Sequence, residues 1–375
     1  MEAPSGSFTI AVDAMGGDRA PAVVVEGAMA YVRERGAHGA AAPGELVLVG
    51  DEPLVRAELG RLGVDSPPFP IVHAPERVDM GEAAATSARR KPNSSIAVCA
   101  RLVKEGQAQA MVSAGNTGAV VAVSQLRLRP LPAVDRPAIA AIIPTQKGTC
   151  VLLDVGANSD CKPNHLLQFA AMGAVYARVI LARPEPRVGL LSIGEESSKG
   201  NELVLATHPL LGKSPLRFVG MVEGRDIFRG AADVVVCDGF TGNVVLKFGE
   251  SVVELLTTRL KREIMSDARS RLGAWVLRPA FARFKRDLDY AEYGGAPLLG
   301  VNGVVIIAHG SSSPKAIKNA IRVAAESVDH HMNELIVEAL EKLEPAGALE
   351  PEPTDAGGQL PGPDAPEPRS REAHG

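Results

Sequence analysis

The chain has few aromatic residues and no long apolar run. Aromatic residues make up 4% of its 375 residues, although 46% are hydrophobic. Its core must therefore be built from aliphatic side chains, which is typical of α/β enzymes. No window approaches the roughly 18 uncharged apolar residues of a membrane-spanning helix. Residues 1–6 lack the basic and apolar regions of a secretory signal, so we expect a cytoplasmic protein.

Cysteine is also scarce. The four cysteines lie far apart and form no CxxC pair, which argues against a structural zinc site or a disulfide framework. The acidic loops of the chain match no calcium-loop spacing and have no histidine cluster beside them. We therefore predict no metal site. The cysteines are Cys99, Cys150, Cys161 and Cys237.

The net charge of −4 is concentrated at the C-terminus. Residues 344–375 hold seven acids against two arginines, so the rest of the chain carries a net charge of about +1. Such a body offers no basic groove with aromatic platforms, and we expect no nucleic-acid partner. Residues 345–375 contain seven prolines and five glycines, which predicts a disordered tail rich in Pro, Gly and Glu.

Short β-branched runs alternate with Ala-rich helical stretches along the chain. This alternation predicts a Rossmann-like α/β/α sandwich whose sheet is mostly parallel, with ligands bound at the carboxyl ends of strands. We expect one α/β domain over residues 7–340. The predicted strands are 8–13, 46–49, 71–73, 110–113, 138–143, 150–155, 187–193, 216–220, 233–237 and 303–308.

Residues 252–290 break this rhythm and predict a protruding amphipathic helical hairpin. Apolar residues recur every four positions from Val252, and Pro279 fits the first position of a second helix. Residues 259–287 have a local net charge of +6 and include the single Trp. Two interpretations fit this pattern: an anionic membrane surface, or a helix pair that forms a dimer and keeps its basic face in solvent.

Glycine-rich junctions follow several of the predicted strands. In residues 306–315 an apolar strand passes through His-Gly and three serines into a helix that begins at Pro314. Free N–H groups and the positive end of the helix dipole suit such a junction to an anion. Related junctions lie within residues 10–21, 112–119, 152–163, 192–202 and 237–247.

Two of these junctions hold candidate catalytic side chains. Lys199 lies in a loop just beyond a strand, where its ammonium can neutralise a phosphoryl or oxyanion charge. Asn243 lies where a helix begins, and its amide can polarise a carbonyl. The alternatives are a surface lysine and an ordinary helix cap, and Asp13 and Asn116 could likewise only cap turns or helices. A GxSxG nucleophile motif is absent.

Six ordered motifs give the chain a close resemblance to the PlsX family of bacterial phosphate acyltransferases, over roughly residues 7–340. The resemblance implies transfer of a long-chain fatty acyl group from an acyl carrier protein thioester to inorganic phosphate, for phospholipid synthesis. The acyl phosphate would serve the glycerol-3-phosphate acyltransferase of the membrane. The motifs are AVDAMGGDRAP (11–21), VSAGNTGA (112–119), LLDVGAN (152–158), IGEESSKGNEL (193–203), CDGFTGNVVLK (237–247) and AHGSSSPKAIKNAIR (308–322).

The resemblance also implies a homodimer without metal or cofactor, attached peripherally to the inner face of the cell membrane through the hairpin. Lys199 and Asn243 match the residues that the family associates with the acyl-phosphate site. The residues predicted to contact the membrane are Leu272, Trp275, Val276, Phe281 and Phe284. Those predicted to bind phosphate or acyl phosphate are Asp13, Gly16, Gly115, Asn116, Thr117, Asp154, Asn158, Glu195, His309, Gly310 and Ser311.

Two alternative functions remain open on the sequence. A phosphotransacetylase-like enzyme using acyl coenzyme A would share the scaffold and the anion loops. A non-catalytic sensor of acyl phosphate or lipid would keep the hairpin but would not need both Lys199 and Asn243. The basic residues within 259–287 also suit an acidic carrier protein, so two partners compete for that surface.

Overall fold

The computed structural model describes residues 8–37, 44–288 and 294–343. The predicted tail, 345–375, lies outside these residues. One sheet of eleven strands runs through the fold in the order β3-β2-β1-β4-β11-β10-β5-β6-β9-β7-β8. The strands are β1 (Thr9–Asp13), β2 (Glu45–Gly50), β3 (Ile71–His73), β4 (Ala110–Ser113), β5 (Ala138–Thr145), β6 (Gly148–Leu153), β7 (Val188–Leu191), β8 (Phe218–Val222), β9 (Val234–Val236), β10 (Ala296–Leu299) and β11 (Val304–Ile307).

The sheet consists of two parallel halves that run in opposite directions. Strands β3, β2, β1, β4 and β11 are parallel to one another, and so are β6, β9, β7 and β8. Between the halves, β10 is antiparallel to both β11 and β5, and β5 is antiparallel to β6. The prediction of a mostly parallel sheet is confirmed, and β10 is the strand that the sequence pattern did not reveal.

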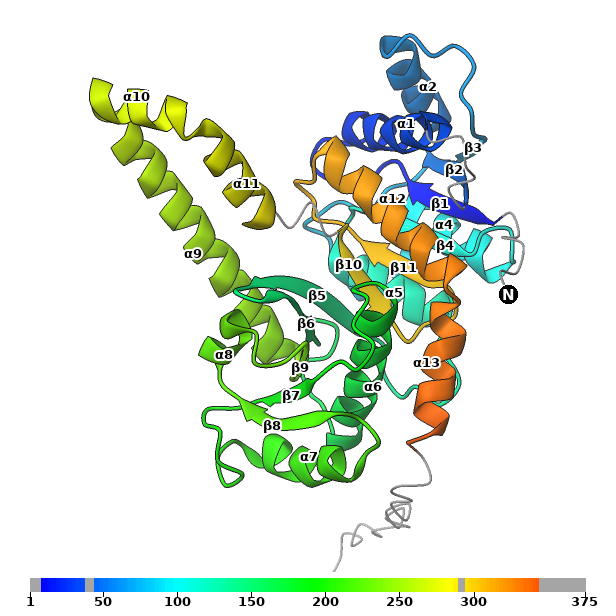
Figure 1. The fold of residues 1–375 in the computed structure, drawn as a ribbon. Helices are drawn as coiled ribbons and strands as arrows, with labels where there is room; N and C mark the ends of the chain where they lie inside the picture. The colour runs from blue at the N-terminus through cyan, green and yellow to red at the C-terminus, as the bar shows by residue number, and fades with distance from the viewer. Residues whose placement is uncertain (1–7, 38–43, 289–293, 344–375) are drawn as a thin grey trace, which may run out of the picture.

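Helices cover both faces of the sheet, as predicted for an α/β/α sandwich (Figure 1). On one face, α1 and α12 pack on the first half and α6 and α13 on the second. On the other face, α4 and α5 belong to one continuous apolar core with strands of both halves. The helices outside the hairpin are α1 (Ala22–Ala37), α2 (Glu52–Arg61), α3 (Ala84–Arg90), α4 (Ser95–Lys104), α5 (Thr117–Arg127), α6 (Pro163–Val179), α7 (Glu202–Lys213), α8 (Gly224–Arg229), α12 (Pro314–Asp329) and α13 (Met332–Glu341).

The predicted hairpin is present and projects away from the sheet (Figure 1). It contains three helices instead of two: α9 (Gly239–Met265), α10 (Ala268–Val276) and α11 (Arg278–Leu288). The additional break follows from Asp267, whose carboxylate caps α10 by accepting hydrogen bonds from the N–H groups of Arg269 and Ser270. Pro279 is the second residue of α11, one position later than predicted. Residues 289–290 of the predicted hairpin lie outside the described residues.

Candidate active site

A buried carboxylate shapes the loop after β6. Asp154 is 0% exposed, and its side chain accepts hydrogen bonds from the N–H groups of Gly156, Ala157 and Asn158 at 2.7 to 3.1 Å. The amide of Asn158 (2.9 Å) and the N–H of Ile139 (3.0 Å) also donate to it. Burial raises the pKa of Asp154, and the hydrogen bonds oppose that rise. The buried carboxylate therefore fixes the conformation of the loop through these hydrogen bonds.

Helix α9 begins directly against this loop. The carboxylate of Asp238 caps the helix by accepting hydrogen bonds from the N–H (2.8 Å) and hydroxyl (2.7 Å) of Thr241. A Cβ atom at Gly239 would lie 2.7 Å from Oδ2 of Asp154, and one at Gly242 would lie 1.9 Å from its carbonyl oxygen. The two glycines thus allow a closer approach than any residue with a side chain permits.

Asn243 is the fifth residue of α9 and faces Gly156. A Cβ at Gly156 would lie 3.9 Å from Cγ and Oδ1 of Asn243, and the φ angle of 140° at Gly156 favours glycine. The helix is capped by Asp238, so the alternative in which Asn243 only caps the helix is wrong. Asn243 is exposed, and its amide makes no hydrogen bond within the part of the chain that the structure describes. The amide can therefore donate to a ligand.

Lys199 is an exposed residue of the loop that follows β7. Its N–H donates to the carbonyl of Glu196 (2.9 Å), and its carbonyl accepts from the hydroxyl of Ser192 (3.3 Å). A Cβ at Gly194 would lie 2.9 Å from Cγ of Lys199, so the stem of the lysine lies against this glycine. Among the described residues, no carboxylate forms an ion pair with its ammonium group. Glu195, in the same loop, approaches Arg225 at 4.0 Å.

These three loops leave the same edge of the sheet, because β9 lies between β6 and β7 and is parallel to both. We call residues 154–158, 192–201 and 238–243 the C-terminal cluster. It contains five of the predicted site residues: Asp154, Asn158, Glu195, Lys199 and Asn243. Within the described residues, neither the Lys199 ammonium nor the Asn243 amide of this cluster has a protein partner.

A second cluster forms at the carboxyl ends of β1, β4 and β11. Asp13 is 1% exposed and accepts hydrogen bonds from the hydroxyl of Ser113 (2.6 Å) and the N–H of Met15 (3.1 Å). Burial raises the pKa of Asp13, and these bonds oppose the rise. A Cβ at Gly16 would lie 2.6 Å from the N–H nitrogen of Gly115, so the loops after β1 and β4 touch backbone to backbone.

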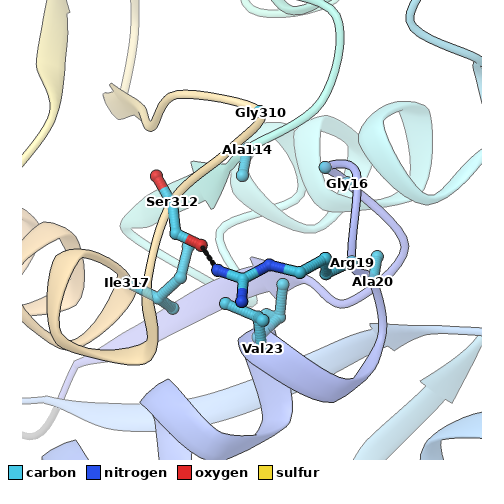
Figure 2. Close-up of a pocket in the computed structure, with 10 residues that line it drawn as sticks. Gly16, Arg19, Ala20, Val23, Ala114, Gly310, Ser312 and Ile317 are labelled. Carbon is cyan, nitrogen blue, oxygen red and sulfur yellow. Dashed lines mark hydrogen bonds between the residues drawn. The ribbon is translucent and has the colours of Figure 1, made fainter. Parts of the chain in front are cut away.

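The loop after β11 completes this N-terminal cluster, which comprises residues 13–19, 113–117 and 308–313. The carbonyl of Gly310 accepts from the N–H of Asp18 (2.9 Å), and Nδ1 of His309 accepts from the N–H of Ser311 (3.2 Å). A cavity lies between the loops (Figure 2), and its volume of about 10 Å³ holds roughly one water molecule.

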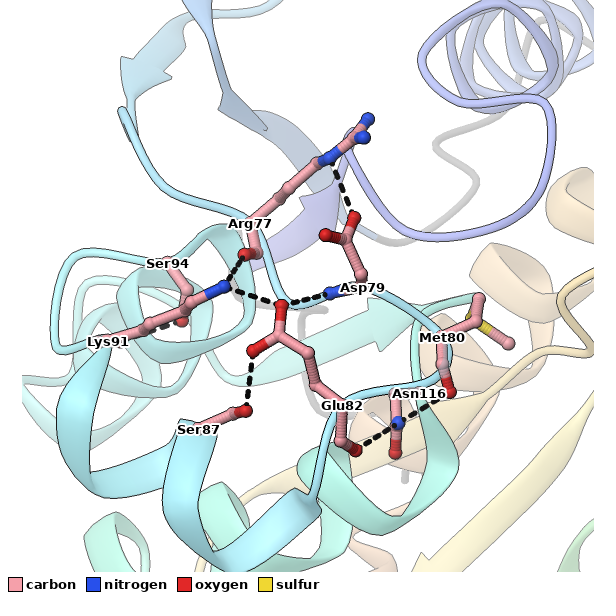
Figure 3. Close-up of polar contacts among 8 residues, drawn as sticks. All are labelled: Arg77, Asp79, Met80, Glu82, Ser87, Lys91, Ser94 and Asn116. Carbon is pink, nitrogen blue, oxygen red and sulfur yellow. Dashed lines mark hydrogen bonds and ion pairs between the residues drawn. The ribbon is translucent and has the colours of Figure 1, made fainter.

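Residues 77–82 form a strap beside the N-terminal cluster (Figure 3). The carboxylate of Glu82 accepts hydrogen bonds from the N–H of Asp79 (2.9 Å), the hydroxyl of Ser87 (2.7 Å) and the ammonium of Lys91. The ammonium also donates to the carbonyl of Arg77 (2.9 Å). The hydrogen bond from Lys91 is the main reason that the pKa of Glu82 falls to about 2.

Asn116 joins the strap to the loop after β4. Its Oδ1 caps α5 by accepting from the N–H of Ala119 (3.0 Å), and its amide nitrogen donates to the carbonyls of Met80 (2.9 Å) and Glu82 (3.1 Å). The capping alternative therefore holds for Asn116, whose side chain is occupied by the protein. Its neighbour Thr117 is exposed at the first position of the helix.

The structure divides the predicted phosphate site in two. Because β10 and β5 reverse the strand direction, the carboxyl ends of β1, β4 and β11 lie at one edge of the sheet and those of β6, β9 and β7 at the other. Predicted residues of one edge are therefore not brought together with those of the other. The N-terminal group is Asp13, Gly16, Gly115, Asn116, Thr117, His309, Gly310 and Ser311.

Comparison with known proteins agrees with the family resemblance of the sequence motifs, and it does so over nearly the whole chain. Residues 8–335 match the family model described as "Fatty acid synthesis protein". The chain is 52% identical over 339 residues to a protein of Pelotomaculum thermopropionicum named "Phosphate acyltransferase", covering 90% of this chain and 97% of that protein. A protein of Geobacter sulfurreducens with the same name is 52% identical over 332 residues, covering 88% and 94%. The chain belongs to the phosphate acyltransferase family.

Two solved structures with a similar fold are titled as phosphotransacetylases. The enzyme from Streptococcus pyogenes has a TM-score of 0.56 and 20% identity, covering 86% of this chain and 94% of that one. The EutD phosphotransacetylase from Staphylococcus aureus has a TM-score of 0.53 and 16% identity, covering 85% and 94%. At this identity the likeness shows the fold alone, and it agrees with the predicted α/β class.

In this member of the phosphate acyltransferase family, two of the residues predicted to bind phosphate are buried carboxylates. Asp13 and Asp154 were predicted to contact phosphate, but both lie beneath their loops and accept hydrogen bonds from them. They shape the loops. Sequence reasoning also missed Glu82 and Lys91, because a pair nine residues apart across a loop and a short helix matches no local spacing rule.

Two kinds of feature are absent from residues 8–37, 44–288 and 294–343. No group of three or more His, Cys, Asp or Glu residues there is placed to hold a metal ion. No helix among these residues is both long and apolar enough to cross a membrane.

Proposed function

We propose that this member of an acyltransferase family transfers a long-chain fatty acyl group from acyl carrier protein to inorganic phosphate. The product, an acyl phosphate, would then be used by the glycerol-3-phosphate acyltransferase of the membrane. Family membership supports the reaction class. The observation that carries the proposal is the C-terminal cluster, where the Lys199 ammonium and the Asn243 amide lie at the same sheet edge and have no partner among the described residues.

The chemistry at this cluster is a thioester exchange. An oxygen of phosphate attacks the thioester carbonyl carbon, the C–S bond breaks, and the carrier thiolate leaves. Lys199 offsets the charge of the incoming phosphate. Asn243 donates its amide N–H to the oxyanion of the tetrahedral intermediate, a contact that strengthens as charge develops on that oxygen. Phosphate is already anionic, so the reaction needs no activated serine.

His309 does not take part in the proposed transfer of the acyl group. It lies in the N-terminal cluster at the other sheet edge, where Nδ1 contacts the hydroxyl of Ser311 at 2.8 Å. Its role in this proposal is to shape the turn at Gly310. Phosphate binding by the N-terminal cluster stays a prediction from sequence, and the proposed reaction does not use it.

The hairpin supports peripheral binding to an anionic membrane. Leu272, Trp275 and Val276 are each more than 60% exposed, and α10 has no buried residue. Phe284 on α11 is also exposed, whereas Phe281 is half-buried. Apolar side chains among basic ones suit the headgroup region of a bilayer. We propose that the protein is cytoplasmic, binds the inner face of the membrane through this hairpin, and forms a homodimer.

The test is a single assay with two donors. The purified protein is incubated with palmitoyl carrier protein and phosphate, and release of carrier thiol is followed together with acyl phosphate trapped by hydroxylamine. Phosphate-dependent release with trapping is the expected result. Turnover with palmitoyl coenzyme A but not with the carrier would favour the phosphotransacetylase-like alternative. No turnover with either donor would favour the non-catalytic sensor of acyl phosphate or lipid.

A further inference from the structure

Five basic side chains lie at the edge of the sheet that also holds the C-terminal cluster. Within the described residues, none of them forms an ion pair or a side-chain hydrogen bond. The stretches that contain them, residues 101–105 and 127–136, hold only two acids and so have a net charge of +3. We call these five residues the basic edge: Arg101, Lys104, Arg127, Arg129 and Arg136.

The directions of the strands place the basic edge beside the C-terminal cluster. Helix α4 ends shortly before β4 begins, and α5 ends shortly before β5 begins. Because β4 and β5 run opposite to β6 and β9, the amino ends of the first two strands lie at the same sheet edge as the carboxyl ends of the other two. Helices α4 and α5 also share an apolar core with Val245 and Leu246 of α9. The basic edge and the start of α9 therefore lie on the same face of the sheet.

Hydrogen bonds fix the segment between α5 and β5 relative to the candidate site. The side-chain amide of Asn302 donates to the carbonyls of Arg129 (3.3 Å) and Pro130 (2.8 Å). At the other end of the segment, the amide of Asn158 in the C-terminal cluster donates to the carbonyl of Pro137 (2.8 Å). The backbone that carries the basic edge here is thus joined directly to the loop after β6.

Arg127 has the environment that most directly indicates an anionic partner. It is half-buried, and its Nε is buried without a hydrogen-bond partner among the described residues. Burial and the neighbouring charge of Arg101 both lower the pKa of Arg127. A carboxylate from a partner would satisfy this donor and offset the repulsion between the two arginines. Leu126, which is 52% exposed, adds an apolar contact beside these charges.

The distance from the basic edge to Asn243 suits a donor whose thioester is carried on a flexible arm. Helix α5 packs over β11, and four strand spacings, about 19 Å, separate β11 from β9 in the sheet. A carrier protein can dock its body at such a distance and extend its arm along the sheet edge to Asn243. A small anion bound at the basic edge would lie too far from Asn243 to react.

The basic residues of the hairpin are less well placed for the carrier. From Asn243 to Met265, where α9 ends, the helix rises about 33 Å, and α10 begins beyond that point. A carrier seated on α10 would also cover the exposed apolar residues proposed to meet the membrane, such as Trp275. Two separate surfaces would remove this competition between the carrier and the membrane.

We propose that the basic edge docks the acidic body of the acyl carrier protein, so that the acyl thioester on its arm reaches Asn243. This inference rests on the proposed function and deepens it, because it assigns the surface that recognises the carrier. Opposite charges mainly speed the encounter of two proteins and fix their orientation, and salt screens them. Docking should therefore weaken as the salt concentration rises.

The experiment measures kcat and KM for palmitoyl carrier protein at saturating phosphate in the double variant Lys104→Glu, Arg129→Glu. Both side chains are exposed, so the fold should tolerate the charge reversals. The double variant should raise KM for the carrier roughly tenfold with little change in kcat, and added salt should shrink the difference. The KM for octanoyl pantetheine, a donor without the carrier, should change little.

Lys213→Glu is the matched control. Lys213 is an exposed lysine at the end of α7, just before β8 begins, and therefore lies at the opposite sheet edge. This charge reversal should leave KM for the carrier at the wild-type value.

An unchanged KM for the carrier in the double variant would overturn the proposal. An equal rise for octanoyl pantetheine would also overturn it, because the substitutions would then act on the active site and not on docking. A raised KM in Arg271→Glu of α10, with none in the double variant, would place the carrier on the hairpin. A wild-type protein without phosphate-dependent turnover would refute the proposed function, and the docking surface would fall with it.

Discussion

Gly242 lies so close to Asp154 that a Cβ atom there would come within 1.9 Å of the Asp154 carbonyl oxygen. This contact joins the first turn of α9 to the loop after β6. It therefore fixes the position of Asn243, one residue further along the helix, above Gly156. The placement of the candidate catalytic amide therefore depends on the absence of a side chain at Gly242.

Gly242→Ala should therefore damage both stability and activity. The new methyl group collides with backbone, which cannot move as the end of a flexible side chain can, and the expected cost is about 3 kcal/mol. Gly249→Ala is the control in the same helix, because its nearest neighbour, Cζ of Phe228, would lie 3.7 Å away. That change should stabilise the protein by about 0.5 to 1 kcal/mol. Urea unfolding of both variants checks this, and equal stabilities would contradict it.

The pair of Glu82 and Lys91 should make stability depend on pH in the acidic range. The pKa of Glu82 is about 2 in the folded protein against 4.5 for the free group. The stabilisation is therefore complete above about pH 4.5 and is lost as the pH falls toward 2. The difference in thermal midpoint between wild type and Glu82→Gln should shrink across this window. A difference that stays constant from pH 6 to pH 2.5 would show that the pair contributes nothing.

Trp275 should report membrane binding directly, since it is the single tryptophan of the chain and is 71% exposed. Anionic vesicles should shift its fluorescence to shorter wavelength, as the indole moves from water into the headgroup region. High salt should weaken the shift, because basic residues of the hairpin contribute the attraction. A spectrum unchanged by vesicles at low salt would remove the hairpin from the proposed membrane contact.

Much of the fold could be predicted from the sequence because its signals are local. Short β-branched runs such as Val234–Val236 favour a buried strand, and the four-residue spacing along α9 favours a helix. Strand β10 (Ala296–Leu299) was not predicted, because it is short and contains a proline. The reversal of strand direction that it creates with β5 could not be predicted for the same reason.

The candidate site could be predicted less completely, because that reversal decides which of the predicted residues lie at the same edge of the sheet. Each glycine-rich junction was identified by its motif, but the motifs carry no information on which sheet edge they reach. Asn116 and Asn243 look alike in sequence, each near the start of a helix after Gly. Only the structure shows that Asn116 caps α5 and that Asp238 leaves Asn243 free.

The central claim is that acyl transfer takes place at the C-terminal cluster. The most direct test is kcat/KM with palmitoyl carrier protein and phosphate for Asn243→Ala, Lys199→Ala and Ser311→Ala. The account predicts a loss of roughly 100-fold to 1,000-fold for Asn243→Ala, the cost of one oxyanion donor, and a comparable loss for Lys199→Ala. Ser311→Ala, at the other sheet edge, should keep wild-type activity. Loss of activity in Ser311→Ala with full activity in the other two variants would contradict the account.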